Sequence, residues 1–130
     1  SPMPFGQYIL DDENRALLAR SAREWSQWFE EASRTGRRVV GLDELIDDGE
    51  IVRVSTVFLG LDHRFGQDDG APILFETMVF GGQLEGEMWR YETWEQAKLG
   101  HQRVCEELKL ERPTKPKELE PMRVVRFRRK

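Results

Sequence analysis

The stretch IVRVSTVFLGL, from Ile51 to Leu61, is the most strand-like segment of the chain. β-Branched and aromatic residues dominate it, and both of its alternating faces are mostly apolar. Such a pattern is typical of a central strand that is covered on both sides. A second strand is predicted over Ile73–Phe80, where Glu76 is the single charged residue. The core is therefore expected to form around these two strands.

Weaker patterns predict further elements around this pair. Two capping-box sequences, Ser21 to Glu24 and Thr93 to Gln96, predict the starts of two helices. The second helix is expected from Trp94 to about Leu108. Short strands are predicted at Gln7–Leu10, Arg37–Leu42 and Met88–Tyr91, an edge strand at Met122–Phe127, and a turn at Asp47–Gly49. The expected fold class is α+β, a small antiparallel sheet of three to five strands with two helices packed on it.

Length and charge predict one domain and a short extension. The 130 residues fit a single domain over residues 1–111, followed by a Pro-containing basic C-terminal extension over residues 112–130. The extension has a local balance of +6, which leaves −10 for the body out of a net charge of −4. An acidic body repels a phosphate backbone, so nucleic-acid contact is expected only through the basic tail Arg123–Lys130.

The chain carries none of the usual signals for export or for a membrane. The first ten residues have neither the basic start nor the apolar stretch of a signal peptide, and the uncharged runs are too short for a membrane helix. We therefore expect a cytoplasmic protein without membrane contact. A single cysteine, Cys105, excludes an internal disulfide framework and a cysteine-based zinc finger, and its place in the helical stripe indicates a small buried hydrophobe.

Candidate ligand-binding residues are few. Asp62 and His63 follow the first strand, Glu76 lies within the second, and His101 lies on the second helix. Two imidazoles with carboxylates can hold a metal ion, with His63 and His101 as its ligands, or act as a general acid–base pair. Each residue also has a structural interpretation: His101 as a hydrogen-bonded helix residue, for example, and Glu76 as the partner of Arg53 or Arg90 in an ion pair.

Two tryptophans are candidates for partner binding. Trp25 and Trp28 share one helical stripe with Phe29, and tryptophan is enriched at interface hot spots. Core packing explains the same spacing. The sequence contains neither a P-loop nor a Gly-rich dinucleotide motif, and it points to no catalytic residue and no cofactor.

Three strings resemble a known family: RVSTVFLGLDHRFG (Arg53–Gly66), PILFETMVFGG (Pro72–Gly82) and RYETWEQAKLGH (Arg90–His101). The family consists of small proteins of unassigned activity that are encoded by tailed phages, prophages and some bacterial genomes. The resemblance spans roughly Gly6 to Leu108. It implies a phage-type genome and an accessory role inside the infected bacterium, and it carries over no site residue or cofactor.

Three functional hypotheses follow. The favoured one is a non-enzymatic phage accessory protein that binds a host or phage macromolecule, in host takeover or against a defence system. An acidic surface suits this role because it presents carboxylates where phosphates would sit. The alternatives are a small-molecule or nucleotide-binding protein, or a small metal-dependent hydrolase, that uses the His/carboxylate residues. Edge strands that need cover are compatible with a homodimer.

Overall fold

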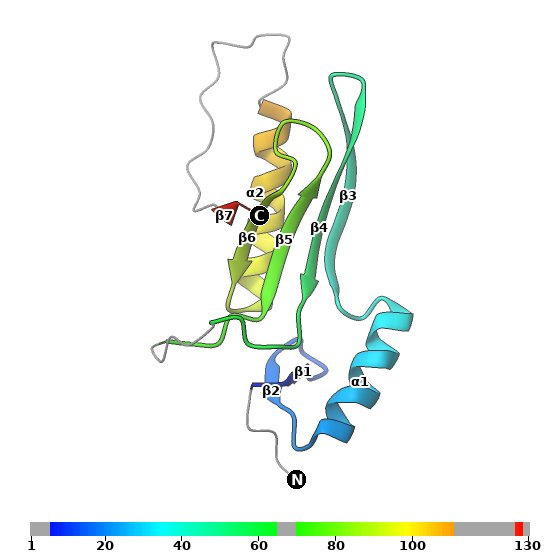
Figure 1. Ribbon diagram of the computed structural model, residues 1–130, viewed down its shortest axis with the longest axis vertical. Coiled ribbons are helices and arrows are strands. Elements are labelled where there is room, and N and C mark those ends of the chain that lie inside the picture. Colours follow the sequence, from blue (N-terminus) through cyan, green and yellow to red (C-terminus); the bar gives the residue numbers. More distant parts are fainter. Residues whose placement is uncertain (1–5, 65–69, 111–126, 129–130) are drawn as a thin grey trace.

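The computed structural model describes residues 6–64, 70–110 and 127–128, and it has the expected α+β class (Figure 1). Its elements in chain order are β1 (Tyr8–Leu10), β2 (Ala16–Leu18), α1 (Ala22–Thr35), β3 (Val39–Asp47), β4 (Glu50–Phe58), β5 (Phe75–Phe80), β6 (Glu87–Tyr91), α2 (Trp94–Leu110) and β7 (Phe127–Arg128). β1 and β2 pair with each other, and the remaining strands form an antiparallel sheet in the order β3-β4-β5-β6-β7. The predicted edge strand and the basic tail lie outside the described residues, apart from the two residues of β7.

Both helices begin where the capping sequences predict. The Ser21 hydroxyl accepts the backbone N–H of Glu24, and the Thr93 hydroxyl accepts that of Gln96. Helix α1 ends at Gly36, which adopts the left-handed conformation at φ 80° that a glycine cap permits. Helix α2 continues to Leu110, slightly beyond the expected end.

The β3–β4 hairpin makes β3 longer than its sequence predicts. Asp48 and Gly49 both have positive φ, as a tight two-residue hairpin turn requires, and pairing of β3 with β4 extends to Asp47. At its other end β3 contains a register shift between Val39 and Gly41. A bulge of this kind changes which side chains face which side of the sheet. It sets Asp43 in register with the buried Val54, on the side that faces α2.

Helix α2 lies along one face of the sheet, whereas α1 lies beyond one end of it (Figure 1). The α2 interface buries Val52 and Val54 of β4 together with Val104 and Leu108 of the helix. A second core cluster, which includes Phe58 and Ala97, connects the sheet to the small β1-β2 sheet.

The aromatic stripe of α1 packs within the chain. Trp28 meets Phe58 edge-on at 5.6 Å, and the Trp25 indole donates to the Gly60 carbonyl at 3.0 Å. Gly60 has φ +78°, and a Cβ there would overlap Phe29. Core packing therefore accounts for the stripe. Both tryptophans remain partly exposed, and their role in partner binding stays a prediction.

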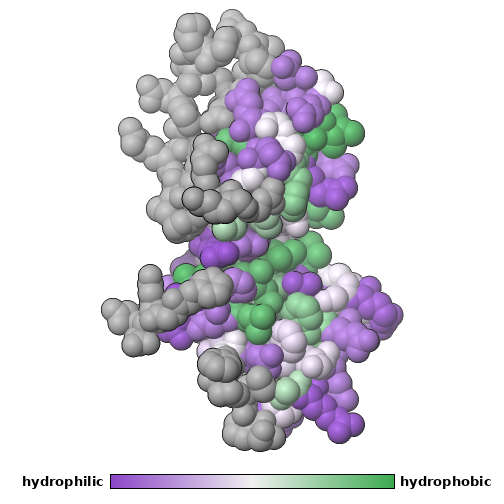
Figure 2. All heavy atoms as spheres, in the orientation of Figure 1, coloured by the Kyte–Doolittle hydropathy of each residue, from purple (hydrophilic) through white to green (hydrophobic). Residues whose placement is uncertain are grey.

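The sheet face opposite α2 is largely uncovered by the described residues, and we call it the open face. We expected cover on both sides of β4. This prediction is wrong for the first residues of the strand, because α1 does not lie across the sheet and Ile51 is exposed. Four apolar side chains of the open face are strongly exposed: Leu42 (57%), Ile46 (53%), Ile51 (63%) and Phe80 (41%). The ion pairs Glu44–Arg53 and Glu76–Arg90 lie on the same face. Figure 2 shows apolar surface along the β3–β4 side and over the middle of the molecule.

Neither described helix is both long enough and apolar enough to cross a membrane.

Gly100 provides a test of how α2 seats on the sheet. Ala normally stabilises a helix interior by about 1 kcal/mol relative to Gly. Here a Cβ would overlap the ring of Tyr91, which rests against the helix at this residue. We expect Gly100→Ala to lower the free energy of unfolding by about 1–3 kcal/mol in urea denaturation, while Lys98→Ala, on the exposed side of α2, changes it by less than about 0.5 kcal/mol. A stabilised Gly100→Ala would contradict this packing.

Candidate functional site

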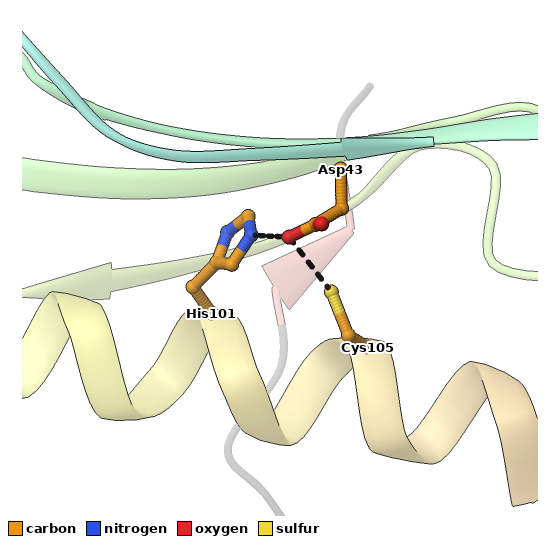
Figure 3. A group of neighbouring side chains, drawn as sticks. All are labelled: Asp43, His101 and Cys105. Atoms are coloured by element: carbon orange, nitrogen blue, oxygen red, sulfur yellow. Dashed lines mark hydrogen bonds and ion pairs between the residues drawn. The ribbon is translucent and has the colours of Figure 1, made fainter. Parts of the chain in front are cut away.

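Asp43, His101 and Cys105 meet where β3 crosses α2 (Figure 3). The His101 Nε2–H donates to the Asp43 carboxylate at 2.7 Å, and the Cys105 thiol donates to the same oxygen at 3.8 Å. His101 and Cys105 are four residues apart on α2, so both project from one side of the helix toward β3. The histidine and the cysteine are buried, whereas the Asp43 side chain is 55% exposed. The site therefore opens to solvent on its carboxylate side.

A glycine allows the imidazole to approach the sheet. A Cβ at Gly41 would lie 2.7–2.9 Å from three atoms of the His101 ring. The ring therefore packs directly against the backbone of β3. The position that Gly41 leaves open fixes where His101 lies relative to Asp43, two residues further along the strand.

The other ring nitrogen of His101 joins a buried chain of hydroxyls. Thr56 Oγ1 lies 2.6 Å from His101 Nδ1 and 2.5 Å from Thr77 Oγ1, which in turn accepts the Tyr91 hydroxyl at 3.0 Å. With a neutral imidazole protonated at Nε2, each hydroxyl donates toward Nδ1 and each group is satisfied. This polar row separates the Val52–Leu108 cluster from the Phe58–Ala97 cluster.

The order hydroxyl–imidazole–carboxylate matches a hydrolase triad, but burial excludes that chemistry here. Thr56 has no exposed surface, so a substrate cannot reach its hydroxyl. Cys105 is equally unsuited to nucleophilic attack, because burial, assisted by the neighbouring Asp43 carboxylate, raises the pKa of its thiol to about 11. The group is better suited to binding than to covalent catalysis.

A shallow pocket of about 210 Å³ opens over the three residues and is also lined by Gln102, Glu106 and Lys109. The three candidate ligand atoms lie within 4.8 Å of one another. Thiolate, imidazole and carboxylate are the ligands that zinc uses in proteins. By its donor set, the cluster fits a divalent metal ion.

The structure does not gather the ligand residues predicted from the sequence. Asp62 accepts hydrogen bonds from the backbone N–H of Ile73 and from the Arg64 guanidinium. Burial raises the pKa of Asp62, but these hydrogen bonds outweigh it and hold the pKa below its usual value. His63 donates from Nδ1 to the Leu61 carbonyl at 2.7 Å. Both residues shape the segment after β4.

Glu76 lies on the other side of the sheet from His101. Its neighbour Thr77 joins the hydroxyl chain under α2, so Glu76 projects to the open face. There it accepts the Arg90 Nε–H at 3.1 Å, which confirms one of the two ion pairs considered from the sequence. Of the four predicted residues, His101 alone belongs to the Asp43–His101–Cys105 cluster.

A larger cavity, of about 370 Å³, lies between the small sheet and the start of α2. Its lining includes Tyr8, Arg15, Pro72 and Trp94. It contains none of the predicted ligand residues. The hypothesis of a small-molecule site built from those residues therefore gains no support from this cavity.

Asp43 is the site residue that the sequence analysis missed. The strand predicted at Arg37–Leu42 ended one residue before it, and the bulge that turns it toward α2 leaves no clear mark in the sequence. The available signal was the spacing of His101 and Cys105. Two residue types that bind metals, four positions apart on one helical stripe, indicate a candidate metal site.

Comparison with protein-family models, curated proteins and solved structures finds no match for this chain.

Removal of the central hydroxyl tests the buried chain. Thr56→Val keeps the shape of the side chain but leaves His101 Nδ1 without its partner. We expect it to lower the free energy of unfolding by about 1–3 kcal/mol. Ser55→Val, one residue along β4 and facing the open side, is expected to change it by less than about 0.5 kcal/mol. Equal effects of the two substitutions in urea denaturation would refute a role for the hydroxyl.

Alkylation tests the environment of Cys105. The thiolate is the reactive form, so a pKa of about 11 predicts that the iodoacetamide rate of the folded, metal-free protein keeps rising up to about pH 11. In urea the same rate is expected to level off above about pH 9, as for an ordinary thiol of pKa about 8.5. A native profile that levels off with the unfolded one would contradict the structure.

Proposed function

We propose that this protein is a non-enzymatic binding protein that uses its open face to dock on another protein. The main support for this proposal is the exposure of four apolar side chains on one side of a sheet: Leu42, Ile46, Ile51 and Phe80. Exposed apolar patches mark interaction sites in folded proteins. Ile46 and Ile51 are cross-strand partners on this face, and the Glu44–Arg53 ion pair lies between them and Leu42. The buried hydroxyl of Thr56 and the protonated thiol of Cys105 support a role without covalent catalysis.

Charge favours a partner different from this chain. On the open face, Glu44 pairs with Arg53 and Glu76 with Arg90, so the face itself is balanced. Exposed carboxylates surround the loop end of the same strands, at Asp48, Glu50 and Glu85. A second copy that packs with its strands in the same direction would bring the same acidic groups against them, and like charges at an interface rim oppose binding.

The partner that fits is a protein with an apolar patch flanked by Lys and Arg. Such a surface is common on proteins that bind nucleic acids, whose phosphates the carboxylates would replace. The resemblance to phage-encoded proteins directs the search to the infected bacterium or to phage proteins, in a host-takeover or anti-defence role within the cytoplasm.

The test compares substitutions on and off the open face. We expect the tagged chain to capture a partner from bacterial extract, with binding that weakens as salt rises. The double variant Ile46→Lys/Ile51→Lys is expected to lose at least about tenfold in affinity, equivalent to about 1.4 kcal/mol. Leu99→Lys is the matched control, because Leu99 is an equally exposed leucine on α2.

Two results would overturn the proposal. One is capture that is unchanged in the double variant or lost equally in Leu99→Lys. The other is sedimentation of the wild-type chain as a stable dimer that Ile46→Lys/Ile51→Lys dissociates, which would assign the open face to a second copy. Circular dichroism of each variant checks that the fold persists.

A further inference from the structure

We propose that Asp43, His101 and Cys105 form a binding site for a zinc-type divalent metal ion that joins β3 to α2. This inference is independent of the proposed docking function. It adds a metal ligand role for Asp43 and Cys105 that the sequence interpretation did not contain.

The donor set selects the class of ion. Imidazole nitrogen and thiolate sulfur favour zinc and its neighbours over the hard cations Mg²⁺ and Ca²⁺, which take oxygen ligands. One carboxylate completes three protein ligands, and the exposed side of Asp43 leaves a fourth position toward the pocket. A tetrahedral zinc ion with three protein ligands takes a water molecule as its fourth ligand.

The geometry requires only a small adjustment. Zinc bonds of about 2.0–2.3 Å in a tetrahedral arrangement place ligand atoms about 3.3–3.8 Å apart. Asp43 Oδ2 lies 3.8 Å from Cys105 Sγ and 2.7 Å from His101 Nε2. The carboxylate must therefore move away from the imidazole by roughly 0.6 Å to admit the ion. The third pair of ligand atoms, His101 Nε2 and Cys105 Sγ, lies within 4.8 Å. It belongs to an exposed side chain on an edge strand, which allows this movement.

The hydroxyl chain provides the support that a ligating histidine needs. A metal on Nε2 requires the proton on Nδ1, which then donates to Thr56 Oγ1 at 2.6 Å. Thr56, Thr77 and Tyr91 each carry a hydroxyl that both donates and accepts, so the hydroxyls of the chain reverse their direction by rotation of their hydrogens. The imidazole itself changes tautomer: the Nε2 proton leaves to solvent as the metal binds, and one proton is taken up from solvent at Nδ1. The imidazole stays neutral, and the thiol of Cys105 releases one proton to solvent as it becomes a ligand.

The test is a Co²⁺ titration of the metal-stripped full chain, followed by absorption spectroscopy. Co²⁺ substitutes for zinc and reports its ligands. We expect a thiolate-to-cobalt charge-transfer band in the near ultraviolet, tetrahedral bands in the visible, saturation at one ion per chain, and loss of both when Zn²⁺ is added. Cys105→Ser should abolish the charge-transfer band, and Asp43→Asn should weaken binding by at least about tenfold.

His63→Ala is the matched control, since His63 is the other histidine of the chain and lies outside the cluster. It should leave the spectrum and the affinity unchanged. The proposal is overturned by a spectrum without the charge-transfer band, by binding to Cys105→Ser as tight as to wild type, or by one ion shared between two chains. Urea denaturation of each metal-free variant separates loss of the ligand from loss of the fold.

Discussion

The structure depends on one constraint: helix α2 covers only one of the two faces of the main sheet. α2 buries one face, where the valines of β4 and β5 meet Val104 and Leu108. α1 lies beyond the end of the sheet, where Trp28 packs against Phe58 in the core cluster that also contains residues of the small β1-β2 sheet. The second face of the main sheet consequently exposes apolar side chains such as Ile46 and Ile51. Both the buried polar row and the open face follow from this division.

Beneath α2, the core contains a polar layer between two apolar clusters. A buried polar group is costly unless it is hydrogen-bonded, so Thr56, Thr77 and His101 are mutually dependent. The same row leads to Asp43 at the surface of β3. A hydrogen-bonded carboxylate thus links the edge strand β3 to α2, at the point where we place the metal ion. Leu42 of the open face lies next to that carboxylate in β3, on the opposite side of the sheet.

The local elements were predictable because their signals are local. The capping residues Ser21 and Thr93 and the turn at Asp48 and Gly49 each act within a few residues, and the structure confirms them. The α+β class followed from the same patterns. The cover of β4 was predicted wrongly, because apolar residues on both faces do not reveal whether a second helix is present to cover them. Asp43 was missed because a bulge in β3 determines which way it faces, and pairing register depends on the distant partner strand.

Solvent paramagnetic relaxation of the side-chain methyls measures most directly whether the second face is open. With a neutral gadolinium chelate in solution, we expect the methyl signals of Ile46 and Ile51 to broaden strongly, while those of Val52, Val54 and Val79 under α2 remain sharp. Methyls of Ile46 and Ile51 that are as protected as those of the valines would show that the face is covered in the isolated protein, and would contradict the account.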